Sequence, residues 1–191
     1  MKKTSILILA ALTGIMVGCK PSREKTVTQI QGLEKRLFSP DVVSFDKSKA
    51  DSLIAMYEEF VKTNPEDSLS PVYLFKAANI EMNNTNGKKA LDLFDQVLQN
   101  YPGYSKAPLC LFFKGFVYEN VMHDLDKARE IYLLFIEKYP TNGFTKDARL
   151  ALKNLGKTPD MIIREFEAQN HADSLRIADS LVKARKNKKQ K

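Results

Sequence analysis

The sequence predicts an all-α fold: a superhelix of about three stacked helical hairpins, followed by a C-terminal helix and a basic tail. Three observations predict it. Apolar residues recur at i, i+1, i+4 and i+5, the spacing of one face of an α-helix. Two segments of the chain match each other at an offset of 38 residues. With only 8 glycines and no tryptophan, the composition favours helices over a turn-rich β fold.

The first 18 residues have the features of a secretory signal peptide. Lys2 and Lys3 precede an apolar run over residues 6–17, which is too short for a stable transmembrane helix. Residues 16–19, Met-Val-Gly-Cys, resemble the bacterial lipobox. The resemblance implies cleavage before Cys19 and lipidation of its thiol, and so a membrane anchor. The alternative is an ordinary signal peptide with a chance cysteine.

The residue after the cysteine predicts a location. Lys20 stands where an aspartate, in the lipoprotein sorting pattern that this region resembles, retains a protein in the inner membrane. We therefore expect an outer-membrane protein, and because no acidic cluster follows, one that faces the periplasm. Residues 19–48 are expected to supply the anchor, a spacer and one short helix over residues 29–38.

A repeat domain is expected over residues 49–156. Each unit is a helix, a short turn, a second helix and then a proline, at Pro65, Pro102 and Pro140, which can stop a helix without breaking it. Residues 83–87 and 123–124 supply turn chemistry inside the units. The positions that match at the offset of 38 are Phe75/Phe113, Lys76/Lys114, Glu81/Glu119, Lys89/Lys127, Ala90/Ala128, Tyr101/Tyr139 and Pro102/Pro140.

This unit resembles the tetratricopeptide repeat. Ala77 and Gly115 stand at the small position of the first helix, while Lys76 and Lys114 replace the aliphatic residue expected just before it. Repeats behind a lipobox are similar to the lipoprotein subunit of the outer-membrane β-barrel assembly machinery and to coordinators of the Tol–Pal system. The resemblance implies a non-enzymatic scaffold that binds an envelope protein or peptide segment and needs no cofactor.

The family pattern also implies a concave binding face lined by first helices. The residues it places there are Leu74, Ala78, Glu81, Leu109, Phe112, Phe116 and Glu119. The helix over residues 109–118 is apolar almost all round, so it is either buried or presents an apolar surface to a partner. Both interpretations of Phe112 and Phe116 stay open: core residues, covered in part by the terminal helix, or a peptide groove.

A closing helix is expected over residues 145–155, ended by Gly156. Thr158 and Pro159 then provide a start signal for a C-terminal helix within residues 157–191. The net charge of +7 lies at the two ends of the chain. Lys2, Lys3 and the six cations in residues 183–191 together carry more positive charge than this total, so the residues between them have a slightly negative net charge. Such a terminal patch does not indicate a nucleic-acid groove.

The sequence shows no pattern that predicts catalysis or metal binding. His123 and His171 stand alone, and there is no phosphate loop or nucleophile elbow. Cys110 lies in an apolar run, where we expect it to pack as a small hydrophobe. The favoured function is therefore an interaction scaffold. The alternative is a lipoprotein that binds a glycan or a lipid.

Asp-Ser-Leu occurs four times in the chain. The motif resembles the Asp-Ser/Thr-aliphatic acceptor of a general O-glycosylation system in some gram-negative periplasms. It makes candidates of Ser52, Ser68, Ser174 and Ser180, with Ser68 expected in a loop. Helix-start chemistry is the alternative explanation, because Asp and Ser favour caps.

Overall fold

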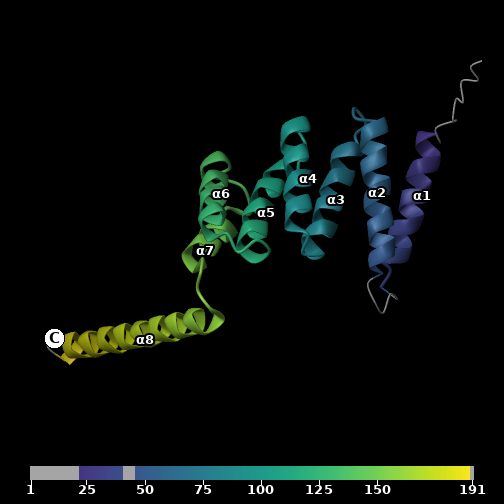
Figure 1. Ribbon diagram of the computed structural model, residues 1–191. Coiled ribbons are helices and arrows are strands. Elements are labelled where there is room, and N and C mark those ends of the chain that lie inside the picture. Colours follow the sequence, from purple (N-terminus) through teal and green to yellow (C-terminus); the bar gives the residue numbers. More distant parts are fainter. Residues whose placement is uncertain (1–21, 41–45, 190–191) are drawn as a thin grey trace, which may run out of the picture.

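The computed structural model describes residues 22–40 and 46–189, and these residues form eight helices (Figure 1). The predicted all-α class is confirmed, since the described part of the chain contains no strand. The helices are α1 (Arg23–Leu37), α2 (Lys47–Thr63), α3 (Ser70–Asn83), α4 (Gly87–Asn100), α5 (Ala107–Asn120), α6 (Leu125–Lys138), α7 (Thr145–Asn154) and α8 (Pro159–Lys189). Cys19 and the leader lie outside the described residues.

Helices α1 to α7 form one row in which each helix packs on the next (Figure 1). The row consists of three hairpins, α1–α2, α3–α4 and α5–α6, and α7 closes it. The predicted superhelix of helical hairpins is confirmed. α8 leaves the row and extends away from it.

The connections between hairpins repeat one hydrogen-bond pattern. The amide of the residue three positions after the helix cap donates to the cap carbonyl, and the next helix begins three residues further on. Ser70 and Thr145, both buried, add a side-chain bond to that carbonyl at 2.6 and 2.7 Å. The predicted proline stops are confirmed, because Pro65, Pro102 and Pro140 each follow a cap residue.

Within the hairpins, a small residue and a hydroxyl hold the two helices together. A Cβ atom on Gly115 would lie 2.5 Å from the Tyr132 ring, so α5 and α6 approach closely at this position. Tyr132 then donates to Glu119 at 2.8 Å. The first hairpin has the same link, because Tyr57 on α2 donates to Glu34 on α1 at 2.6 Å.

The helix expected over residues 29–38 is longer than expected, and it belongs to the repeat body. α1 begins at Arg23 and buries Ile30 and Leu37 in the same core cluster as α2 and α3. The packed body therefore starts ahead of residue 49. The spacing between α1 and α2 differs from that in the later hairpins, which is why the sequence repeat does not register it.

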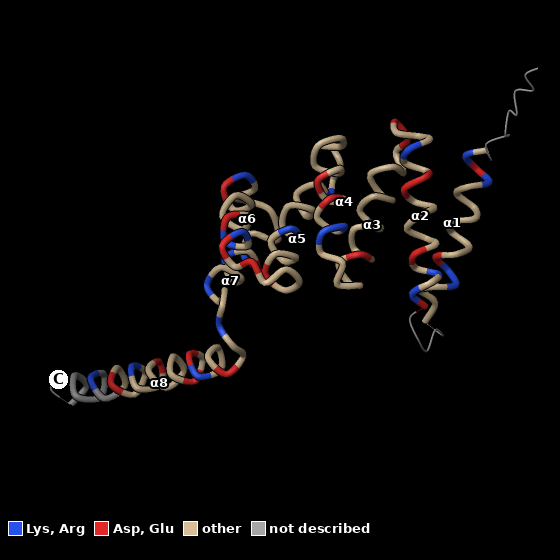
Figure 2. The backbone as a smooth tube through the Cα atoms, viewed as in Figure 1, with Lys and Arg blue, Asp and Glu red and all other residues tan. Residues whose placement is uncertain are grey.

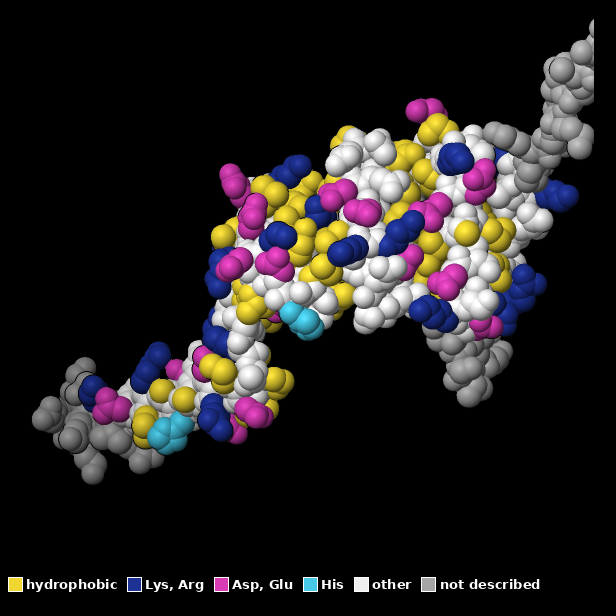
Figure 3. Space-filling view, in the orientation of Figure 1, with side chains coloured by type: hydrophobic (Ala, Val, Ile, Leu, Met, Phe, Trp, Pro, Cys, Tyr) yellow, Lys and Arg dark blue, Asp and Glu magenta, His cyan; other side chains and the backbone are white. Residues whose placement is uncertain are grey.

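No helix in the described part of the chain is both long and apolar enough to cross a membrane. α8 is the longest, with 31 residues, and every residue from 159 to 181 is exposed. In the space-filling view it is a rod whose hydrophobic side chains face solvent (Figure 3).

Candidate functional site

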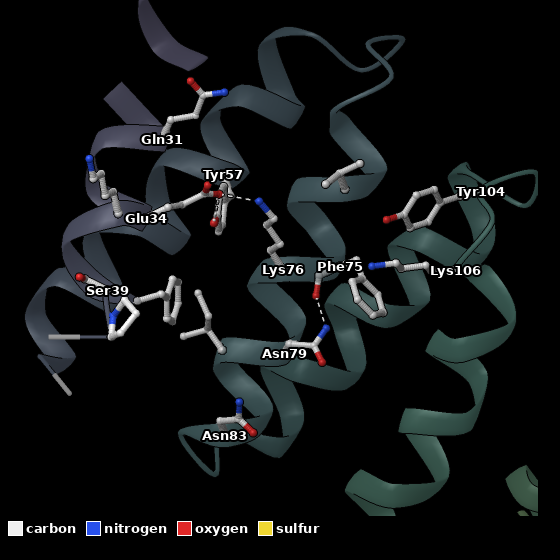
Figure 4. Close-up of a pocket in the computed structure, with 15 residues that line it drawn as sticks. Gln31, Glu34, Ser39, Tyr57, Phe75, Lys76, Asn79, Asn83, Tyr104 and Lys106 are labelled. Atoms are coloured by element: carbon white, nitrogen blue, oxygen red, sulfur yellow. Dashed lines mark hydrogen bonds and ion pairs between the residues drawn. The ribbon is translucent and has the colours of Figure 1, made fainter. Parts of the chain in front are cut away.

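The candidate site is an open cleft between α1 and α3, next to the start of α5, with a volume of about 750 Å³ (Figure 4). It arises because α1 and α3, the first helices of successive hairpins, both pack on α2, and Lys76 on α3 reaches Glu34 on α1 across the opening. Its lining residues are Gln31, Glu34, Lys35, Phe38, Ser39, Pro40, Tyr57, Val72, Phe75, Lys76, Asn79, Ile80, Asn83, Tyr104 and Lys106.

The deep part of the cleft is a fixed polar cluster on an apolar floor. Glu34 Oε1 accepts hydrogen bonds from Tyr57 at 2.6 Å and from Lys76 Nζ at 2.8 Å, and so joins α1, α2 and α3 (Figure 4). Burial, and then the hydrogen bond to Glu34, raise the pKa of Tyr57 well above its usual range. Tyr57 is therefore a neutral donor at physiological pH.

The open part of the cleft combines amides with cations. Asn79 Nδ2 donates to the Phe75 carbonyl at 2.6 Å, which orients this amide along α3, and Asn83 is exposed one turn further on. Lys106 lies over the Phe75 ring at 5.0 Å, and Lys35 is exposed on the α1 side. Side-chain amides can bond both the N–H and the C=O of a bound main chain.

The aromatic rings of the cleft are largely occupied by neighbouring rings. Phe75 stacks on Phe113 with ring centres 6.2 Å apart, and Tyr57 stacks on Tyr73 at 4.9 Å. Phe38, at the rim, is the large aromatic that is mostly exposed, at 55%. The cleft therefore offers an apolar floor and one exposed aromatic side chain, Phe38. It does not offer a set of open ring faces on which a sugar could stack.

The groove residues expected from the sequence do not line this cleft. Leu74 and Ala78 are fully buried in the core, so a partner cannot contact them in the folded chain. Glu81 is buried as well and accepts from Asn86 at 3.1 Å. The physical reason is that these residues lie on the face of α3 that packs into the row, whereas Lys76, Asn79 and Asn83 lie on the face that lines the cleft.

The expected residues on α5 have mixed positions. Leu109, Phe112 and Glu119 are partly buried, and Phe116 is 40% exposed. The Phe112 ring packs against Tyr132 and Phe135 of α6, at 5.8 and 5.7 Å between ring centres. α8 does not lie over these residues. Phe112 therefore packs against α6, as the core interpretation expects, and Phe116 is accessible; a peptide groove at Phe116 stays a prediction.

The sequence did contain one signal of the cleft. Lys76 departs from the aliphatic residue that the repeat pattern expects, and it is the residue that reaches Glu34 across the cleft. Lys114, the matching departure, bonds Asp95 on α4 instead, at 2.5 Å. The α1 residues of the cleft had no such signal, because α1 lies outside the repeated offset.

The four candidate glycosylation serines are all exposed. Ser68 lies in the loop before α3, beside a hollow of about 510 Å³, while Ser52, Ser174 and Ser180 lie on helices. Asp67 in the same motif accepts from the Leu69 amide at 2.9 Å, so turn chemistry accounts for this Asp. Cys110 is buried, and burial raises the pKa of its thiol to about 12.

Comparison with known families gives one result that bears on the hairpins. The tetratricopeptide repeat family matches residues 73–104 and 111–142, which are most of α3–α4 and α5–α6 with the loops after them. These two segments are similar to tetratricopeptide repeats. Such repeats are protein-interaction modules, and the match therefore indicates a scaffold for protein–protein interaction. Comparison with curated proteins gives no match.

Proposed function

We propose that the chain is a lipid-anchored scaffold of the gram-negative envelope that holds a segment of another envelope protein in the cleft between α1 and α3. The observation that supports the proposal best is the open cleft itself, set in a body of tetratricopeptide repeats. By resemblance, the role is outer-membrane protein assembly or envelope maintenance at the periplasmic face. The chemistry of this site calls for binding, and we propose no catalytic step.

The lining of the cleft suits an extended or helical peptide. An apolar side chain can lie against Phe38 at the rim, while the Asn79 and Asn83 amides of the cleft are available to its main chain. Preformed apolar surface with a few fixed polar groups is typical of binding sites in helical scaffolds. The glycan or lipid alternative has less support, because the Tyr57 and Phe75 rings are already stacked.

The proposed anchor would place the cleft close to the membrane. Arg23, where α1 begins, is four positions after Cys19, with three residues between them. A fully extended chain spans at most about 3.5 Å per residue, so a lipid on Cys19 would hold α1 within about 15 Å of the bilayer surface. A partner segment would therefore be one that reaches the membrane surface.

Partner capture tests the binding site. Phe38→Glu and Asn83→Arg change exposed cleft residues, so the repeat should keep its helical content while cross-linking to protein partners in the native envelope is lost. Leu133→Glu is the matched control, because Leu133 on α6 is 54% exposed, like Phe38, and lies outside the cleft. Equal capture by all three variants would rule out the cleft, and recovery of phospholipid or sugar alone would favour the alternative.

Replacement of the cysteine tests the anchor separately. Cys19→Ser should move the protein from the membrane fraction to the soluble fraction after cell breakage, with the repeat body still folded by circular dichroism. Membrane retention of the variant would show that Cys19 is not the anchor, without any bearing on the cleft.

A further inference from the structure

α7 has the position of the first helix of a fourth hairpin, but it lacks a second helix. It enters through the same connection as α3, since Thr145 repeats the bond that Ser70 makes. Leu74, Phe112 and Leu150 occupy the same register, 38 residues apart. Leu74 is 1% exposed and Leu150 is 56% exposed. Phe112 is covered by α6, the second helix of its hairpin, and nothing in the described residues covers Leu150 in that way.

The first turns of α8 carry the apolar pattern of a second helix. α6 presents Ile131, Tyr132 and Phe135 at i, i+1 and i+4, and α8 presents Ile162, Ile163 and Phe166 at the same spacing. In α8 the pattern begins one turn nearer the helix start. α7 is shorter than α5 by about one turn, with 10 residues against 14. The earlier start of the pattern in α8 therefore compensates for the shorter α7, and the apolar residues of the two helices would face each other.

The connection and the charges also fit a hairpin. Residues 155–158 join α7 to α8, and four residues likewise join α5 to α6. α7 has a formal charge of +2, and residues 159–173 of α8 have −3 (Figure 2). Opposite net charges on two helices that both expose apolar residues favour their association.

In the chain itself, α8 does not pack along α7. It projects away from the row, with Phe166 65% exposed (Figures 1 and 3). Two contacts of Lys157 stabilise the segment between α7 and α8 in this extended arrangement. Its amide donates to the Asn154 carbonyl at 2.9 Å, and its Nζ pairs with Glu165 at 2.6 Å. The open face of α7 is thereby left to another molecule.

We propose that the first half of α8 from a second copy of this chain packs on α7 and completes the fourth hairpin. Each copy carries both surfaces, so two copies exchange their α8 helices and form a closed dimer with two-fold symmetry. The terminal unit of a stacked-repeat protein needs its apolar end covered, and the exchange covers both ends at once. The proposal is independent of what the cleft binds.

Disulfide trapping between two differently tagged full-length copies tests the exchange. One copy carries Leu150→Cys and the other carries Phe166→Cys, so a disulfide joins the tags only if α7 and α8 meet in trans. Ala168→Cys, on the opposite side of α8, is the matched control in place of Phe166→Cys. The native Cys110 is buried, and the pair of tagged parent chains measures the background from Cys19.

The expected result is a tag-to-tag disulfide with Phe166→Cys and only background with Ala168→Cys. Equal yields from both positions, or no disulfide between the copies, would overturn the proposal. So would a disulfide that forms only when Leu150→Cys and Phe166→Cys are in the same chain, since α8 would then fold back in cis. As a second measurement, Phe166→Glu should reduce the native mass from two chains to one, and Ala168→Glu should leave it unchanged.

Discussion

At the scale of the residue, close contacts between paired helices depend on the absence of a side chain. Gly115 has no space for a Cβ atom, because the Tyr132 ring is buried and its hydroxyl is held by Glu119. The ring therefore cannot move aside at low cost. Gly32 on α1 differs, since a Cβ there would have nothing within 4 Å.

Replacing each of the two glycines with alanine should change the free energy of unfolding in opposite directions. Gly32→Ala should raise the free energy of unfolding by up to about 1 kcal/mol, the gain in helix propensity. Gly115→Ala gains the same propensity but overpacks the hairpin at a cost of about 1–3 kcal/mol, so stability should fall. Urea denaturation followed by circular dichroism measures both. A gain in both variants would mean that α5 and α6 are not closely packed.

Ala78 and Phe116 occupy equivalent positions in successive repeats, but their surroundings differ. Ala78 is 0% exposed, whereas Phe116 is 40% exposed. Ala78→Glu would bury an unpaired charge at a cost of several kcal/mol, and we expect loss of cooperative unfolding. Phe116→Glu should remain folded, with a change of about 1 kcal/mol or less. If thermal unfolding shows Phe116→Glu to be the more damaging change, the assignment of the buried face is wrong.

At the scale of the element, α1 is fastened to the loop before α3 by one ion pair. Arg23 Nη2 donates to Asp67 Oδ1 at 3.1 Å, and its Nε also bonds this carboxylate. The hydrogen bond from Arg23 is the main cause that lowers the pKa of Asp67 below its ordinary value of 3.8. A segment far from α3 in sequence is thereby tied to it.

The lowered pKa of Asp67 predicts how stability responds to acid. A carboxyl group whose pKa is lower in the folded state than in the unfolded state adds to the free energy of unfolding. This contribution is complete when the pH is above the pKa of the unfolded state, and it is lost as the pH falls through the pKa of the folded state. Asp67→Asn should therefore be less stable than the parent at pH 7, and the difference should shrink below about pH 4. Denaturant unfolding at pH 7 and pH 3 measures it. A constant difference would show that the charge of Asp67 is not the cause.

At the scale of the whole molecule, the packed row and α8 are separate in their contacts. Residues 159–181 are exposed throughout, so the core clusters of the row contain no residue of α8. The stability of the row should thus depend on α8 only through association with another copy.

Truncation of the chain after Gly156 separates the stability of the row itself from the stability that α8 adds through association. The truncated chain should lose the helical signal of α8, and its melting temperature should not change with protein concentration. The full-length chain should match it at high dilution and become more stable as concentration rises, because binding to the folded state stabilises by mass action. A truncated chain that melts lower even at high dilution would mean that α8 packs on its own row.

Much of the fold could be predicted from the sequence. Helical spacing, the prolines at positions 65, 102 and 140, and Gly156 are local signals, and the helices end where these residues predict. Gly156 indeed has a φ of +79° just beyond α7. The small position at Gly115 was also predicted, since a close contact between paired helices recurs with the repeat.

The candidate site was only partly predictable. The sequence assigned Leu74 and Ala78 to a groove, because the repeat pattern marks which helix face they occupy but not what covers it. Lys76 was visible as a departure from the pattern, although its partner Glu34 lies 42 residues away on a helix outside the repeat.

The sequence by itself determined most of the helices and their hairpin pairing, since both depend on residues close together in the chain; the lipid anchor at Cys19 stays a prediction. The tertiary structure decided which faces stay open: the α1–α3 cleft, the end of α7 and the apolar side of α8. The physical reason is that one helix face can be core or surface according to its neighbour. That neighbour is set by how the hairpins stack, and no single segment of the chain encodes it.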